Sequence, residues 1–172
     1  MAIEPSLIPL DNVDPALIEA LLDRAFEPER HQRTAYKVRG DADWLPTLSF
    51  AAVDEEQHLV GTIQCWPVAL TDEAGRRHPM IMVGPVAVLP EVQGRGFGKA
   101  LVTASIRAID PRAPLPLVMI GDPAYYGRFW GFTNAGTSGW DLPGPFEKTR
   151  LLVRSASTVV LPEKGMLGPW LG

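Results

Sequence analysis

The sequence predicts an α+β protein with a mixed, mostly antiparallel central sheet flanked by helices. Apolar runs of strand length at 48–53, 59–70 and 80–89 follow one another across short polar connections, which favours hairpins. Runs with helical spacing stand before and after these strands. The 172 residues contain no internal repeat, low-complexity block or linker. We therefore expect one domain over residues 1–172, with residues 155–172 as a loose C-terminal tail.

Composition narrows the function classes. A net charge of −4 argues against a nucleic-acid binder held by its overall field. The single cysteine, Cys65, cannot form an internal disulfide, and the N-terminus lacks the pattern of a signal peptide. No apolar run approaches the length that spans a bilayer. We expect a cytoplasmic protein with neither nucleic acid nor membrane as a partner.

Capping residues, prolines and glycines in the sequence predict where the helices and strands begin and end. Asp14-Pro15 offers an N-cap and a first-turn proline for a helix to about Phe26, and Asp122-Pro123 repeats this pattern for a short helix to about Trp130. Pro67 implies a bulge or an edge within its strand. The remaining expected elements are a helix around 30–38 ended by Gly40, a helix over 98–110, a strand over 115–121 and a strand over 150–153.

Three glycines alternate immediately before the helix expected at 98–110. Gly94, Gly96 and Gly98 lie between a strand and this helix, where backbone N–H groups and the helix dipole can form an anion site. A P-loop would need Gly at position 93 and Ser or Thr at 100, but these positions hold Gln93 and Ala100. The dinucleotide-binding fingerprint fails as well, because position 99 is lysine. A tight structural turn is the alternative interpretation.

What remains is Gln-x-x-Gly-x-Gly over 93–98, directly after GPVAVLPEV. This motif resembles the pyrophosphate-binding motif of the GNAT superfamily of acyl-CoA-dependent N-acyltransferases. A second stretch, LVMIGDPAYYGRFWGF over 117–132, resembles the strand and aromatic-rich helix of the same superfamily, and its wording is similar to the YhbS-like group of predicted acetyltransferases. The resemblance runs from about residue 5 to 154 and implies a GNAT-like fold in which two central strands splay apart to hold acyl-CoA.

The resemblance implies a binding site for acetyl-CoA as co-substrate. The backbone of the glycine segment would bind the pyrophosphate, with added charge from two basic side chains, and the pantetheine arm would lie along two strand segments, one of which supplies an N–H to the thioester carbonyl. The implied cofactor-binding residues are Val86, Ala87, Val88, Gln93, Gly94, Arg95, Gly96, Phe97, Gly98, Lys99, Ile120 and Gly121, with Met119 beside them.

The same resemblance implies direct attack by a primary amine on the thioester, with a tyrosine as general acid for the departing thiolate. Tyr126 corresponds to that tyrosine by position, and Tyr125 is the alternative because adjacent helical residues point about 100° apart. The superfamily pattern is Tyr-x-x-x-Gly-Phe, whereas here Trp130 adds a residue before Gly131, so either the helix end bulges or the tyrosine is displaced. Packing is the alternative for both tyrosines. No general base is assigned, since Glu91 is expected to point to water.

The remaining candidate residues give weaker indications of function. The three histidines lack metal-ligand spacing, Cys65 is expected to be buried, and no Gly-x-Ser-x-Gly hydrolase motif occurs. Tyr36, Trp44 and Trp66 fall where the resemblance places an acceptor pocket, or form an ordinary aromatic core. We therefore expect an N-acetyltransferase acting on a small-molecule or peptide amine. An inactive acyl-CoA sensor or partner-binding module and a purely structural domain are the alternatives, and a homodimer stays open.

Overall fold

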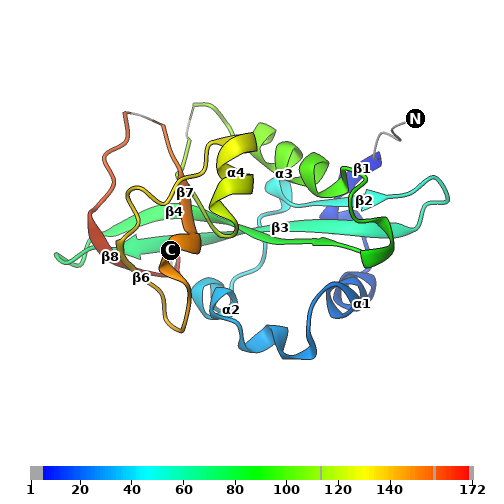
Figure 1. Cartoon of the computed structure of the whole chain (residues 1–172), viewed down its shortest axis with the longest axis horizontal. Coiled ribbons are helices and arrows are strands. Elements are labelled where there is room, and N and C mark those ends of the chain that lie inside the picture. The colour runs from blue at the N-terminus through cyan, green and yellow to red at the C-terminus, as the bar shows by residue number, and fades with distance from the viewer. Residues whose placement is uncertain (1–5, 113, 157, 171–172) are drawn as a thin grey trace. The chain divides into compact units, whose positions relative to one another are not determined.

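The structure is a computed structural model that describes residues 6–112, 114–156 and 158–170. The ends of the expected domain, residues 1–5 and 171–172, lie outside the described residues. Its helices are α1 (Pro15–Ala25), α2 (Thr34–Arg39), α3 (Phe97–Arg107) and α4 (Pro123–Trp130), and its strands are β1 (Ser6–Pro9), β2 (Phe50–Val53), β3 (Leu59–Thr71), β4 (Arg77–Val88), β5 (Leu117–Ile120), β6 (Gly139–Asp141), β7 (Leu151–Arg154) and β8 (Lys164–Pro169) (Figure 1). Short 3-10 turns cover Leu10–Asn12, Pro28–Gln32, Pro46–Leu48, Pro90–Val92 and Lys148–Arg150.

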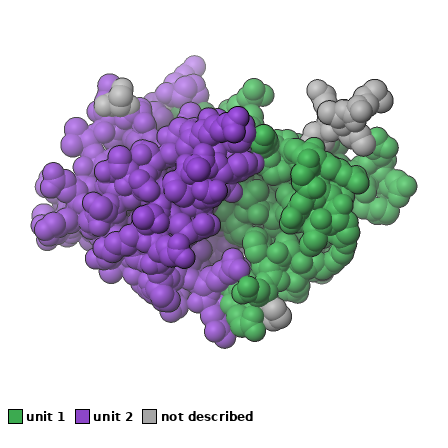
Figure 2. Space-filling model, in the orientation of Figure 1, with its two compact units in different colours: residues 1–30, 44–65, 84–110 green, residues 31–43, 66–83, 111–172 purple. Residues whose placement is uncertain are grey.

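The described chain divides into two compact units (Figure 2). Unit 1 comprises residues up to Arg30 together with 44–65 and 84–110, and unit 2 comprises 31–43, 66–83 and the residues from Pro111 onward. The long strands β3 and β4 each contribute residues to both units.

Unit 1 contains an antiparallel group of strands with a helix on each face. β2 pairs with β1 on one side and with the first part of β3 on the other. Helices α1 and α3 lie on opposite sides of these strands (Figure 1). The core under α1 consists of small and aliphatic side chains from the 3-10 turn before the helix, from the helix itself, and from β2 and β4: Leu10, Ile18, Leu21, Leu22, Ala51 and Ala87.

Helix α1 has the N-cap, the first-turn proline and the apolar spacing that predicted it from the sequence. The Asp14 carboxylate accepts a hydrogen bond from the N–H of Ala16 at 3.0 Å, and Pro15 occupies the first turn. Ile18, Leu21 and Leu22 recur at helical spacing and are all buried. The helix ends at Ala25, one residue before the expected end. The predicted cap, proline and buried face are confirmed.

Unit 2 mixes parallel and antiparallel strands. β4 pairs in parallel with β5, and β5 pairs antiparallel with β7. β3 pairs antiparallel with β8, and β8 pairs in parallel with β6. Antiparallel pairings therefore outnumber parallel ones in the described part of the chain, so the sheet is mixed and mostly antiparallel. The predicted fold class is confirmed.

The expectation of a loose C-terminal tail is wrong for the part that forms β8. Leu167 of β8 pairs with Leu70 of β3 and is buried. The segment was missed because it is glycine-rich and its pairing partner lies almost one hundred residues earlier in the chain. The short strands β1 and β6 were missed as well, since neither shows a run of alternating residues long enough to predict a strand.

The predicted helix around 30–38 is in fact a 3-10 turn followed by the six-residue α2, which ends at Gly40 as expected. Pro67 lies between the β3 residues that pair with β2, which end at Ile63, and those that pair with β8, which begin at Val68. A residue without an N–H is tolerated at such a change of partner. Within the described part of the chain, no helix has the length and apolar character needed to cross a membrane.

Candidate active site

The glycine segment of unit 1 opens α3 with two residues in the left-handed region. Gly94 has φ +85° and Gly96, the N-cap of α3, has φ +90°. A Cβ at either position would meet no atom within 4 Å. Glycine is therefore required by backbone conformation at these two positions, because other residues adopt positive φ only at a cost. The space around the segment stays open for a ligand to approach its backbone.

The segment is fixed to the strand that precedes it. The side-chain amide of Gln93 donates to the carbonyl of Val88 at the end of β4, at 3.3 Å. The Phe97 side chain is buried, so only its backbone could contact a ligand. A Cβ at Gly98 would lie 3.8 Å from Val88 Cγ2, an ordinary contact distance. The loop thus leads from β4 into α3 with its N–H groups at a helix N-terminus.

Charge near this segment is favourable to an anion. Arg95 and Lys99 are both exposed. Glu91, which was expected to point to water, instead forms an ion pair with Arg24 of α1, although both side chains remain more than half exposed. That pairing offsets the negative charge of Glu91, three residues before Gly94. The N–H groups at the start of α3 and the helix dipole add to this field, so the loop can bind a phosphate group.

The two expected pantetheine-binding segments lie one in each unit. Ala87 of β4 is buried, while its neighbours Val86 and Val88 are partly exposed. Ahead of them, Gly84 has φ +122° and is followed by a proline, which interrupts the regular conformation of β4. In unit 2, Ile120 ends β5 and is partly exposed, and the N–H of Gly121 donates to the carbonyl of Arg150 at 2.9 Å.

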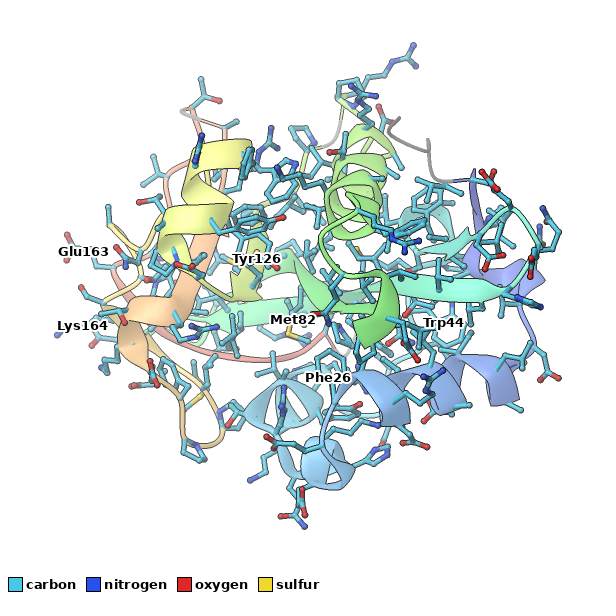
Figure 3. The ribbon with its side chains drawn as sticks, turned by 45° about the vertical axis from the view of Figure 1, so that its right-hand side comes forward. Phe26, Trp44, Met82, Tyr126, Glu163 and Lys164 are labelled. Carbon is cyan, nitrogen blue, oxygen red and sulfur yellow. The ribbon has the colours of Figure 1, made fainter. Side chains whose placement is uncertain are left out.

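Tyr126 projects from α4 and packs on the end of β5 (Figure 3). A Cβ built on Gly121 would lie 2.6 Å from Cε2 of Tyr126, so the tyrosine ring covers the space that a larger residue would fill. Helix α4 is held at its start by the Asp122 carboxylate, which accepts from the N–H of Ala124 at 3.0 Å. Phe132 stands edge-on to the Tyr126 ring, with centroids 6.3 Å apart. These contacts fix the position of the phenol.

The pKa values of both tyrosines lie above the ordinary value of a phenol. Burial raises the pKa of Tyr126, and the neighbouring Tyr125 raises it further, while Arg150 acts in the opposite direction. Burial alone raises the pKa of Tyr125. The two rings meet edge to face, with centroids 5.0 Å apart. A phenol with a raised pKa keeps its proton and can therefore donate it.

Helix α4 ends in a left-handed glycine cap directly after Trp130. The N–H of Gly131 donates to the carbonyl of Gly127 at 3.0 Å, and the N–H of Phe132 reaches back to the carbonyl of Tyr126 at 3.4 Å. Gly131 itself has φ +75°, which glycine adopts readily. Trp130 is the last residue of the helix, and which of the two expected alternatives applies stays a prediction.

The aromatic residues expected near an acceptor pocket have distinct surroundings. In unit 2, the Arg39 guanidinium lies between the rings of Tyr36 and Trp66, 3.7 and 3.9 Å from their centroids. In unit 1, Trp44 packs against the core under α1, and its indole N–H donates to Asp11 at 3.0 Å. The sequence analysis missed Arg39, because a lone arginine at a helix end carries no recognisable signal.

Cys65 is buried as expected, and burial raises the pKa of its thiol to about 12. Such a thiol is unreactive near neutral pH. Among the described residues, no three His, Cys, Asp or Glu side chains are grouped so that they could hold a metal ion. The expectation that no metal takes part stays a prediction.

Two further polar residues were missed by the sequence analysis. Thr62 and Gln64 interrupt the apolar run of β3, and both are almost fully buried. Neither Oγ1 of Thr62 nor Oε1 of Gln64 has a hydrogen-bond partner in the described structure. The signal that could have found them is their placement: two polar side chains at alternate positions in an otherwise apolar strand share one face.

Comparison with known proteins identifies related sequences. The model of the Acetyltransferase (GNAT) family matches residues 16–112, more than half of the chain. A relative described as "Uncharacterized N-acetyltransferase YhbS", from Escherichia coli strain K12, is 31% identical over 123 residues, which are 72% of this chain and 70% of the relative.

Solved structures agree with this similarity. The GNAT family N-acetyltransferase YhbS from Escherichia coli, solved in complex with CoA, superposes with a TM-score of 0.74 at 26% identity and covers 99% of this chain and 92% of that one. A GNAT family acetyltransferase from Brucella melitensis, solved with acetyl-CoA, has a TM-score of 0.63 at 22% identity and covers 98% of this chain and 97% of that one. The similarity to the Brucella melitensis structure, at 22% identity, shows only that the two proteins share a fold.

Proposed function

Because the chain belongs to the GNAT family of acetyltransferases, we propose that this acyltransferase moves the acetyl group of acetyl-CoA to a primary amine of a small molecule or peptide. The observation that carries the proposal is the open glycine segment at the N-terminus of α3. CoA in the Escherichia coli relative supports the choice of donor. The relatives are named as N-acetyltransferases, which gives no support to the alternative of an inactive binding module.

The residues present fit acetyl-CoA. The backbone of Gly94 and Gly96 is open to solvent and oriented by positive φ, and the N–H groups that follow begin α3. Phosphate oxygens accept hydrogen bonds from such groups, and Arg95 and Lys99 add positive charge. We assign the pyrophosphate to this segment. The pantetheine arm is assigned to the backbone of 86–88 and of Met119–Gly121, as the resemblance implies.

When bound, acetyl-CoA supplies a thioester that a neutral amine can attack at the carbonyl carbon, forming the amide as the carbon–sulfur bond breaks. An N–H in the segment 86–88 would stabilise negative charge on the carbonyl oxygen. The Tyr126 hydroxyl would protonate the departing thiolate, and water would return a proton to Tyr126 and take the one released by the amine. We choose Tyr126 over Tyr125 because its ring lies directly on Gly121 at the end of β5.

A single domain over the whole chain, with a cytoplasmic location, is part of the same proposal. A homodimer is a further proposal.

Tyrosine variants test the proposal. In Tyr126→Phe we expect kcat for acetyl transfer to a panel of primary amines to fall by roughly 10²–10⁴-fold, because a positioned general acid contributes on that order. The measurement is the rate of CoA release with acetyl-CoA and each amine. Tyr125→Phe is the matched control on the same helix and should keep most of the activity. Equal loss in both variants, or none in either, would contradict the assignment of Tyr126.

A further inference from the structure

Thr62 and Gln64 lie on the face of β3 that α1 covers. In the register of β2 and β3, Thr62 is directly opposite Ala51, and Ala51 belongs to the core under α1. A Cβ on Gly61, in contrast, would approach Leu101 of α3. Side chains alternate along a strand, so Gln64 shares the α1 side with Thr62. We call Thr62 and Gln64 the polar pair.

The polar pair lies in the buried part of unit 1. Thr62 is 0% and Gln64 3% exposed, yet Thr62 Oγ1 and Gln64 Oε1 have no hydrogen-bond partner in the described structure. The core-facing residues of α1 are aliphatic and offer no donor. A buried polar atom left without a partner carries the full cost of its desolvation, so such atoms call for a ligand, a water or a functional role.

The chemistry of the polar pair selects the ligand. An amide oxygen only accepts hydrogen bonds and a hydroxyl oxygen can accept, so the missing partner is a donor with N–H or O–H groups. Neither atom carries a charge. A carboxylate would favour an ammonium, whereas neutral acceptors in a desolvated place favour the neutral amine, which is the form that can attack a thioester.

We propose that Gln64 Oε1 and Thr62 Oγ1 accept the N–H hydrogens of the acetyl acceptor, and that this acceptor is a primary amine carried on an apolar group. The apolar group is inferred from two partly buried aromatic residues, Phe26 and Trp44, which pack against the same core (Figure 3). The inference rests on the proposed function and adds the substrate class and two acceptor-binding residues to it.

Apolar variants of similar shape test the polar pair. Gln64→Leu and Thr62→Val should each lower kcat/KM for phenethylamine about tenfold or more, mainly through KM, which corresponds to about 1.4 kcal/mol per factor of ten. Both should keep the melting temperature or raise it, because an unpartnered buried oxygen is removed. The rise in melting temperature on adding acetyl-CoA should equal that of the wild type.

Ser105→Ala is the matched control, since this buried hydroxyl donates to the carbonyl of Leu48 at 2.7 Å. It should lower the melting temperature and keep the kinetic constants. Gln64→Glu supplies a second readout that loss of a purely structural contact would not change. Its carboxylate favours the ammonium form of the bound amine, so the rise of kcat with pH should shift to higher pH.

Unchanged kcat/KM in Gln64→Leu and Thr62→Val would overturn the inference and leave the polar pair as a site for water. A wild type that acetylates spermidine and not phenethylamine would overturn the substrate class. A wild type that binds acetyl-CoA and acetylates neither amine would overturn the inference without affecting donor binding. Failure of the proposed function has a different signature, because the wild type would then release no CoA with any primary amine of the panel.

Discussion

The contact between Gly121 and Tyr126 links one glycine to the proposed proton donor. In Gly121→Ala the new methyl group would lie 2.6 Å from Cε2 of Tyr126, so the ring must move. We expect kcat to fall about 10–100-fold, because displacement of a catalytic group by about 1 Å can cost that much. Steady-state kinetics of CoA release measures the effect. Gly136→Ala is the control, since a Cβ there meets nothing within 4 Å, and equal kinetics in the two variants would show that the ring position does not matter.

The Cys65 thiol makes stability depend on pH in the alkaline range. Its pKa is about 12 in the folded protein against 9.0 as the ordinary value, so the stabilisation is complete below pH 9 and is lost as the pH rises toward 12. Between pH 8 and pH 10 we expect the wild type to lose about 1.4 kcal/mol more unfolding free energy than Cys65→Ala. Denaturant unfolding at both pH values measures this. The control Val53→Ala should follow the wild type, and the same loss in Cys65→Ala would refute the assignment.

At single positions, the sequence predicted what depends on local backbone conformation. Alternating glycines before a helix indicated the turn, and Gly94 and Gly96 both have positive φ. The ring of Tyr126 on Gly121 could not be predicted, because it depends on how α4 turns back on β5. Whether Thr62 and Gln64 find hydrogen-bond partners depends on which helix covers their face of β3. The local sequence does not indicate which helix that is.

At the scale of elements, α1 and α4 share the same cap. Asp14 and Asp122 each accept a hydrogen bond at 3.0 Å from an N–H two residues later. Asp14→Ala and Asp122→Ala should each reduce the unfolding free energy by about 1 kcal/mol. Only Asp122→Ala should also lower kcat well below the melting temperature, since α4 holds Tyr126. Thermal unfolding together with kinetics at 15 °C checks this, and equal kinetics in the two variants would contradict a positioning role for α4.

Elements with their own start signals were predictable, and elements made by distant pairing were not. Asp-Pro caps mark both α1 and α4, and β3 and β4 are long strands of 13 and 12 residues that are mostly apolar. β8 has no comparable pattern. It forms because Val68–Thr71 offers an edge to which Met166–Pro169 can bond.

At the scale of the whole molecule, the fold class and the family could be predicted, because two motifs occur in the right order along most of the chain. The division into two compact units could not, because both β3 and β4 contribute to each unit and no linker marks a boundary. The acceptor was also beyond prediction from motifs, since the placement of Thr62 and Gln64 in an apolar strand indicates one shared face but not that their oxygens lack partners.

The central claim is that the glycine segment binds acetyl-CoA through its backbone. Gly96→Ala and Gly75→Ala form a matched pair, because the two glycines have φ +90° and +82° and a Cβ at either meets nothing within 4 Å. Similar backbone strain should lower both melting temperatures by similar amounts. Gly75 lies in the turn between β3 and β4, so its substitution leaves the segment unchanged.

We would measure the melting temperature of the wild type and both variants with and without acetyl-CoA. A ligand at 100 times its Kd stabilises a protein by about 2.7 kcal/mol, which gives a clear upward shift. The account predicts this shift in the wild type and Gly75→Ala, and a reduced shift or none in Gly96→Ala. An equal shift in all three proteins, or no shift in the wild type, would contradict it.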